Sequence, residues 1–151
     1  MYDYQFTVVD FPSVILASWQ SRVRVSDIPA RIPRLFDRVY AGLLAVGIEQ
    51  SGHNHVLYDQ FSPDGMRMRV GVPVASLFED RAEIKCFEFT GGRAAHTQHR
   101  GSYSQLHEAQ GQLNLWCRQQ SAEAAGLSWE VYGDWSDAID DLVTDVYILL
   151  K

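Results

Sequence analysis

The order of the predicted secondary-structure elements occurs twice along this chain of 151 residues. Segments rich in β-branched and aromatic residues are typical of strands, whereas apolar residues at three- and four-residue spacing indicate a helix. In the first half, about residues 1–76, two strand-like segments precede a helical segment and two follow it. The second half, about residues 82–151, has the same order. The sequence therefore predicts two similar strand-strand-helix-strand-strand halves.

The boundaries of these elements follow from local signals. The first helix has its apolar face between Ile32 and Leu44 and is expected to stop at Gly47, because glycine adopts the left-handed conformation that ends many helices. The second helix is expected to begin after a capping box at Ser102 and to end at Gly126. The predicted strands are residues 4–9, 13–21, 55–61, 66–74, 83–89, 93–99, 128–132 and 143–150.

This arrangement predicts an α+β fold, with an antiparallel sheet that carries both helices on one face. A short internal similarity supports the repeat, since Leu57–Phe61 (LYDQF) aligns with Val131–Trp135 (VYGDW). The opposite face of the sheet, where the two halves meet, is expected to form a groove, and ligand pockets favour such junctions. We therefore expect a single domain over residues 1–151 that holds a small molecule.

The charge distribution argues against direct nucleic-acid binding by this chain. The 13 lysine and arginine residues are scattered, and 19 aspartate and glutamate residues give a net charge of −6. Binding to phosphates requires a basic face. No apolar run approaches the roughly 20 residues that span a bilayer, and the first residues do not resemble a signal peptide. Two lone cysteines, Cys86 and Cys117, fit a reducing compartment, so we expect a cytoplasmic protein.

The segment Gly126–Trp135 (GLSWEVYGDW) is the most informative for function. Side chains alternate along a strand, so Glu130 and Tyr132 share one face while Trp129 and Val131 share the other. If Trp129 and Val131 pack on the helices, Glu130 and Tyr132 face the groove. A carboxylate among aromatic rings is costly to desolvate, and an incoming cation would offset that cost and gain cation–π contacts. The alternative is that Glu130 is a solvated strand residue.

The string WEVY at residues 129–132 resembles the signature of the gyrase-inhibitor-like (GyrI-like) small-molecule-binding family, which includes the effector-binding domains of AraC-type and MerR-type transcription regulators. Phe87–Leu106 is similar to the family's strand, glycine turn, strand and helix entry, and Thr144–Leu150 (TDVYILL) is similar to its last strand. The resemblance covers essentially the whole chain. It implies a groove for flat, hydrophobic, often cationic compounds, with the family's glutamate at Glu130 and its tyrosine at Tyr132.

Other side chains are candidates for lining the same groove. By position in the repeat, Tyr58 and Phe61 would face it from the first half, and Trp19 and His96 are further candidates. The alternative for each aromatic residue is ordinary core packing, and for His96 a surface position. A slip of one residue in a predicted strand reverses the face of every side chain.

The chain departs from the regulator pattern at its start. Such regulators carry a helix-turn-helix domain ahead of the binding domain, whereas the first predicted strand here begins almost at Met1. The sequence favours a stand-alone sensor or drug-sequestering protein. If it regulates transcription, we expect it to do so through a protein partner, or the DNA-binding part has been lost.

Two alternative functions remain open. Some family members are enzymes that open the cyclopropane ring of DNA-alkylating natural products. In such an enzyme Glu130 would act as general base, and Tyr103 or Tyr132 would support the leaving centre. Binding is favoured over catalysis, because a fold resemblance does not define site chemistry. The second alternative is a protein that inhibits gyrase by direct interaction.

The five histidines do not form a metal-ligand pattern. His53 and His55 would share a strand face, whereas His96 and His99 would point to opposite faces, and no cysteine or carboxylate completes either set. The sequence also lacks a glycine-rich phosphate loop and a Gly-x-Ser-x-Gly motif. We therefore expect neither a metal ion nor a cofactor.

Overall fold

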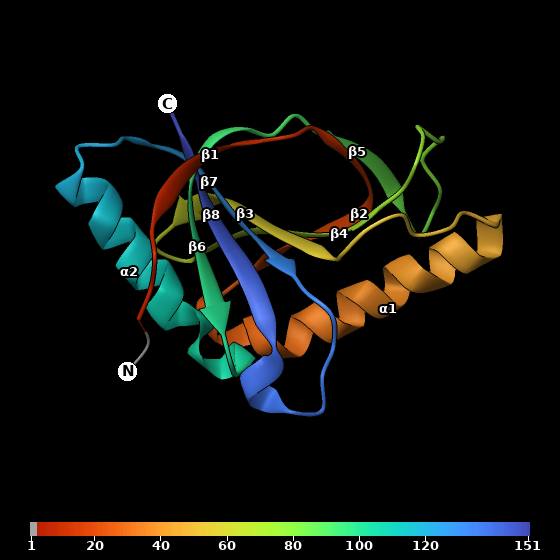
Figure 1. The fold of residues 1–151 in the computed structure, drawn as a ribbon. Helices are drawn as coiled ribbons and strands as arrows, with labels where there is room; N and C mark the ends of the chain where they lie inside the picture. Colours follow the sequence, from red (N-terminus) through yellow and green to blue (C-terminus); the bar gives the residue numbers. More distant parts are fainter. Residues whose placement is uncertain (1–2) are drawn as a thin grey trace. The chain divides into compact units, whose positions relative to one another are not determined.

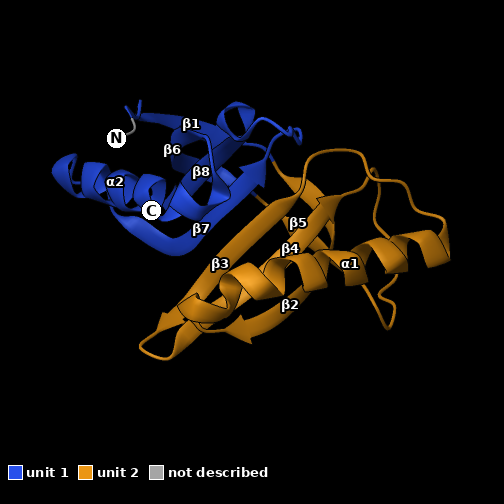
Figure 2. Ribbon diagram, turned by 90° about the horizontal axis from the view of Figure 1, so that it is seen from below, with its two compact units in different colours: residues 1–12, 91–151 blue, residues 13–90 orange. Residues whose placement is uncertain are grey.

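The computed structural model describes residues 3–151, and the chain divides into two compact units (Figures 1 and 2). Unit 1 comprises the residues up to Pro12 together with Gly91–Lys151, and unit 2 comprises Ser13–Thr90. Each unit consists of an antiparallel four-stranded sheet and one long helix. The predicted α+β fold with antiparallel strands is thus confirmed. Within residues 3–151, no helix has the length and hydropathy needed to cross a membrane.

In unit 2 the strands pair in the order β3-β4-β2-β5. Their bounds are β2 (Val14–Val23), β3 (His55–Ser62), β4 (Gly65–Pro73) and β5 (Lys85–Phe89). Helix α1 (Ile28–Val46) starts with a proline in its first turn and ends at Gly47, whose φ of 74° is left-handed, as predicted. The helix crosses this sheet (Figure 2) and buries the apolar side chains Leu35, Phe36, Val39 and Leu43. The amphipathic pattern read from the sequence therefore determines which side of α1 packs on the strands.

In unit 1 the strands pair in the order β1-β6-β8-β7. Their bounds are β1 (Thr7–Phe11), β6 (Gly92–Arg100), β7 (Ala124–Tyr132) and β8 (Val143–Leu150). Helix α2 (Leu106–Gln119) follows a short 3-10 turn, η2 (Tyr103–Gln105). One apolar cluster joins the helix to the sheet, and its buried members are Ala95, Leu106, Ala109, Leu113, Cys117, Val146, Ile148 and Leu150.

The first strand of each predicted half pairs with a strand of the other half. Strand β1 pairs with β6, with Val9 opposite Ala94, and strand β5 pairs with β2, with Leu16 opposite Phe87. Each compact unit therefore combines strands from both sequence halves. The order of elements along a chain does not specify this exchange, because strand pairing depends on contacts between distant residues.

The predicted end of the second helix is wrong. We expected it at Gly126, but α2 ends at Gln119 and β7 begins at Ala124. Gly126 lies inside β7 with a φ of 85°, where the pairing with β8 shifts between Ala124 and Ser128. A glycine with positive φ can end a helix or accommodate a β-bulge, and here it does the second.

Candidate functional site

The register of β7 and β8 determines the face on which Glu130 lies. Glu130 is opposite Val146, and Tyr132 is opposite Thr144. Val146 belongs to the apolar cluster that packs against α2, and the half-buried Tyr132 ring packs against the same cluster. Directly opposite residues in paired strands point to the same face. Glu130 and Tyr132 therefore lie on the face of the unit 1 sheet that carries α2.

This arrangement corrects the faces expected from the sequence. Trp129 is fully buried on the opposite face, where its ring stacks on Tyr147 with centroids 5.1 Å apart and meets Phe11 edge-on at 5.1 Å. The expectation assumed that a large apolar residue on β7 must pack on the helix. Instead, β6 and β8 contribute aliphatic side chains to that core, and Trp129 packs in a separate aromatic cluster. The groove expected on the helix-free face therefore does not include Glu130 and Tyr132.

The Glu130 carboxylate is buried beside the Tyr132 hydroxyl. Glu130 is only 8% exposed, so it is not the solvated strand residue of the alternative interpretation. The Tyr132 hydroxyl donates a hydrogen bond of 2.9 Å to Glu130 Oε1. Because removing a carboxylate from water is costly, the group gains from every donor or cation that reaches it.

Two more aromatic rings extend from Tyr132 toward the surface. The ring of Tyr103, in η2, meets the Tyr132 ring edge-on with centroids 5.4 Å apart. The Trp135 ring lies 6.4 Å from that of Tyr103 and is 71% exposed. Burial raises the pKa of Tyr103 above 10, the usual value for tyrosine. We refer to Glu130, Tyr132, Tyr103 and Trp135 together as the Glu130 site.

A buried histidine fixes the turn that carries Tyr103. His99 is fully buried, and its Nε2 lies 2.9 Å from the Ser102 carbonyl oxygen. Since a carbonyl oxygen only accepts, Nε2 donates to it, and Nδ1 lies 2.8 Å from the Tyr4 hydroxyl, with which it forms a second hydrogen bond. The Ser102 hydroxyl in turn accepts from the Ser104 backbone N–H, so Ser102 caps η2, whereas the capping box predicted at the start of the second helix does not form, because α2 begins after Gln105 without a side-chain cap. The orientation of Tyr103 thus depends on side chains in β6 and ahead of β1.

The aromatic candidates of unit 2 also lie on a helix-bearing face. The guanidinium of Arg38, on α1, lies 3.8 Å from the centroid of the Trp19 ring. Tyr58 is half-buried opposite Met68, on the same face of the sheet as Trp19. Phe61 follows an irregularity in β3 and is 53% exposed. The Trp19 ring thus already has a cation against its face.

His96 lies on the opposite face of the unit 1 sheet from Glu130. It is the cross-strand partner of Tyr147, with ring centroids 4.8 Å apart. Its Nε2 lies 2.8 Å from Asp145 Oδ1, an oxygen that also accepts from the Gln98 amide at 3.3 Å. The structure thus brings Glu130, Tyr132 and Tyr103 together within unit 1 and places His96 on the other side of the same sheet.

Sequence reasoning missed two residues at this site. Trp135 had a usable signal, since it aligns with Phe61 in the internal repeat. Thr144 had none, because a threonine in a strand is ordinary. In the structure Thr144 is fully buried opposite both Tyr132 and His99, and its hydroxyl has no hydrogen-bond partner among residues 3–151.

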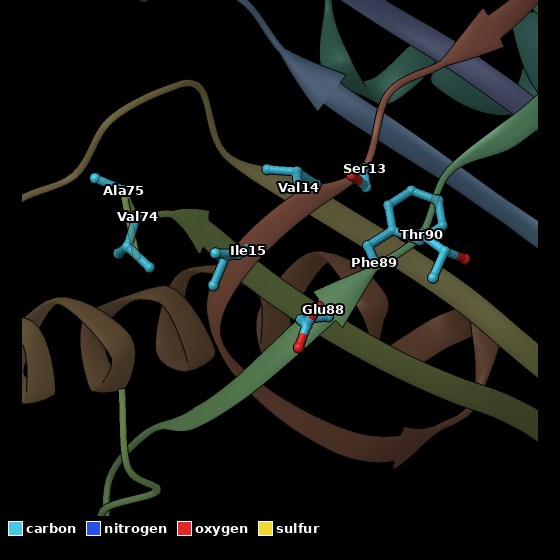
Figure 3. A pocket seen from close by; sticks show the side chains of 8 residues that line it. All are labelled: Ser13, Val14, Ile15, Val74, Ala75, Glu88, Phe89 and Thr90. Atoms are coloured by element: carbon cyan, nitrogen blue, oxygen red, sulfur yellow. The ribbon is translucent and has the colours of Figure 1, made fainter. Parts of the chain in front are cut away.

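The detected hollows are lined by other residues. One in unit 2 has a volume of about 310 Å³ (Figure 3), and its lining is Ser13, Val14, Ile15, Val74, Ala75, Glu88, Phe89 and Thr90. Another, of about 500 Å³, lies beside Val8 and Trp116 in unit 1. Neither of these two hollows is lined by a residue of the Glu130 site. Across the described part of the chain, no three His, Cys, Asp or Glu side chains gather closely enough to hold a metal ion.

Comparison by sequence finds no matching protein-family model and no matching curated protein. Comparison by structure finds similar proteins. The chain superposes on the EcmrR C-terminal domain with a TM-score of 0.83 and 18% identity, over 98% of both chains. The similarity to EcmrR in its complex with DNA has a TM-score of 0.82 and 17% identity, and there 98% of this chain corresponds to 57% of the EcmrR chain.

Two further structures share the fold. SAV2435 bound to tetraphenylphosphonium has a TM-score of 0.72 and 12% identity, over 97% of this chain and 94% of that one. A hydrolase from Listeria innocua has a TM-score of 0.65 and 9% identity, over 97% and 92%. The chain therefore shares the fold of these proteins, and the GyrI-like resemblance inferred from the sequence is confirmed at the level of the fold.

Proposed function

We propose that this protein binds hydrophobic organic cations at the Glu130 site. Glu130 is the counter-ion, and the rings of Tyr132, Tyr103 and Trp135 are the walls. The observation that carries the proposal is a carboxylate, 8% exposed, at the inner end of a row of aromatic rings that begins at the surface. A bound cation offsets the desolvation cost of the carboxylate, and the rings add cation–π attraction.

Binding opens the site by moving aromatic side chains. Tyr103 stands on a 3-10 turn of three residues, and Trp135 lies in the connection between β7 and β8, so both rings can rotate without disrupting a strand. In the free protein the Tyr132 hydroxyl donates a hydrogen bond to the Glu130 carboxylate. An incoming cation takes the place of this hydroxyl beside the carboxylate. Exposed side chains change rotamer on the nanosecond scale, so such opening need not slow association.

The similarity to SAV2435 supports this class of ligand. The structure of that protein contains tetraphenylphosphonium, a large hydrophobic cation. The acidic net charge of this chain, −6, favours the approach of cations over anions. Both features agree with a buried carboxylate as the recognition element.

The test is a pair of phenyl-substituted phosphorus compounds, one of which is a cation and the other neutral. Tetraphenylphosphonium and the neutral triphenylphosphine oxide are titrated into the wild type and Glu130→Gln, with affinity measured by calorimetry and thermal shift. We expect Glu130→Gln to weaken the binding of the cation by about tenfold or more, which corresponds to about 1.4 kcal/mol. The affinity for the neutral ligand should be nearly unchanged.

The matched control is Glu88→Gln, which neutralises an exposed carboxylate in the unit 2 hollow and is expected to have no effect on either ligand. Equal loss for both ligands in Glu130→Gln would contradict the proposal. Alanine variants of Tyr58, Phe61, Trp19 and His96 in the same titration test whether these residues also contact the ligand.

A hydrolase is the second candidate, and it is favoured by the hydrogen bond between Glu130 and Tyr132, with the Tyr103 ring against that of Tyr132. Glu130 would take a proton from a water that attacks a strained carbon, and the protonated hydroxyl of Tyr103 would donate to the group that receives the electrons of the broken ring bond. The Listeria innocua hydrolase supports this candidate through its fold. Glu130→Gln would then retain binding of a cyclopropane-containing compound and lose its turnover, which product analysis measures directly.

A further inference from the structure

The Thr144 hydroxyl is a buried polar group without a partner. Thr144 is fully buried in β8, and its Oγ1 accepts and donates no hydrogen bond among residues 3–151. Buried hydroxyl groups normally have at least one partner, so such an exception needs a reason. Thr97 on the neighbouring strand illustrates the usual case, because it is equally buried and its hydroxyl donates to the Gln5 carbonyl at 2.8 Å.

The position of Thr144 connects it to the Glu130 site. Thr144 is the direct cross-strand partner of Tyr132, so the two side chains leave the sheet on the same face with their Cβ atoms about 5 Å apart. Glu130 is the diagonal neighbour on the same face, two residues before Tyr132. Glu130, Tyr132 and Thr144 are thus neighbours on one face of the sheet.

We propose that Thr144 is a second hydrogen-bonding anchor of the Glu130 site and makes the site select protonated primary and secondary amines over quaternary cations. This inference rests on the proposed function and adds a ligand class to it. A protonated primary or secondary amine has at least two N–H donors, one for the Glu130 carboxylate and one for the Thr144 hydroxyl. A quaternary ammonium or phosphonium ion has none, so it gains only the charge attraction and leaves Thr144 unsatisfied.

A methylation series of one amine separates these contributions. 2-Naphthylmethylamine and its N-methyl, N,N-dimethyl and N,N,N-trimethyl forms carry three, two, one and no N–H donors on the same aromatic body, and all four are cations at neutral pH. We expect the wild type to bind the first two about tenfold more tightly than the trimethyl form, as for one hydrogen bond to a charged group. Isothermal titration calorimetry at constant pH measures all four affinities.

Thr144→Val removes the hydroxyl and preserves the side-chain shape. We expect this variant to bind the primary and secondary amines about tenfold more weakly than the wild type does, and the trimethyl form less than about twofold more weakly. Because it also removes an unsatisfied hydroxyl, it should raise the melting temperature of the free protein. The matched control Thr97→Val deletes a hydroxyl that has a partner, so it should lower the melting temperature and leave the order of the four affinities unchanged.

Several outcomes would overturn the inference. One is a wild type that binds all four compounds equally. Another is that Thr144→Val leaves the four binding affinities unchanged. A third is that Thr144→Val lowers the melting temperature, because the Thr144 hydroxyl of the wild type would then have a partner in solution. If the trimethyl form still binds and depends on Glu130, the proposed function stands without the role of Thr144. If none of the four binds, both fail.

Discussion

The Tyr132 hydroxyl and the Glu130 carboxylate are joined by a hydrogen bond of 2.9 Å although they belong to the same strand, with one residue between them. Residues two apart in a strand point to the same face, so the long tyrosine side chain bends back over the glutamate. The free protein thereby covers its buried carboxylate with a donor of its own.

Removal of that donor should destabilise the free protein. Tyr132→Phe removes the hydroxyl that donates a hydrogen bond to the buried Glu130 carboxylate. We therefore expect the free energy of unfolding to fall by about 1–3 kcal/mol. Urea unfolding followed by circular dichroism measures the change. Tyr103→Phe is the control, because it alters a neighbouring phenol whose hydroxyl does not bond to Glu130, and it should change stability by less than about 0.5 kcal/mol. Equal stability of Tyr132→Phe and the wild type would contradict this assignment.

The hydrogen bonds of His99 should determine how well Tyr103 is positioned. Tyr4→Phe removes the hydroxyl that bonds to Nδ1, and we expect it to cost about 1 kcal/mol of stability. His99→Leu breaks both bonds and leaves the Ser102 carbonyl unpaired, so it should cost about 2–4 kcal/mol. Both variants should also bind tetraphenylphosphonium more weakly, because the turn that carries Tyr103 is then less rigidly held. Stability loss with unchanged ligand affinity would show that His99 supports the core alone.

Asp80 is expected to protect the edge of the unit 2 sheet. Strand β5 is last in the pairing order of that unit, and the Asp80 side chain accepts from the Cys86 backbone N–H at 2.8 Å. An open strand edge is a template for pairing with another molecule. We predict that Asp80→Ala increases concentration-dependent self-association in light scattering, whereas Asp80→Asn, which keeps an oxygen acceptor, does so much less. Identical scattering of Asp80→Ala and wild type would refute the prediction.

Mild acid should destabilise the protein through His55. Burial is the main cause that lowers the pKa of His55 below its usual 6.5, against the raising effect of its bond to the His53 carbonyl. The unfolded chain then takes up a proton at this residue more readily than the folded one. The contribution of the neutral His55 ring to the free energy of unfolding is therefore complete above pH 6.5, and it declines as the pH falls below that value. Thermal unfolding between pH 7.5 and 5 should show a smaller decline in His55→Gln; an identical decline would exclude His55 as the cause.

Local patterns in the sequence predicted local structure well. Strand β8 has the bounds predicted for it, residues 143–150, and α1 ends at Gly47 with the expected left-handed φ. The alternation of side chains along β7 also correctly predicted that Glu130 and Tyr132 lie on the opposite face from Trp129. These features depend on side-chain periodicity and on the conformational preferences of single residues, which the sequence displays directly.

Features that depend on pairing between distant segments were not predictable. Alternation along β7 separates two faces but does not say which of them carries the helix, and the bulk of Trp129 favoured the wrong choice. The aliphatic residues that pack on α2, such as Val146 and Ile148, identify that face only once the register with β8 is known. The role proposed for Thr144 has the same origin, because only the register places it beside Tyr132.

The exchange of β1 and β5 has a consequence for biosynthesis. Unit 2 is one uninterrupted stretch, Ser13–Thr90, so the strand pairs within this unit can all form once the ribosome has passed that stretch. Strand β1 precedes unit 2 in the chain, yet it pairs with β6, which is made only after residues 13–90. The nascent chain therefore contains β1 without its β6 partner while the residues of unit 2 are being added.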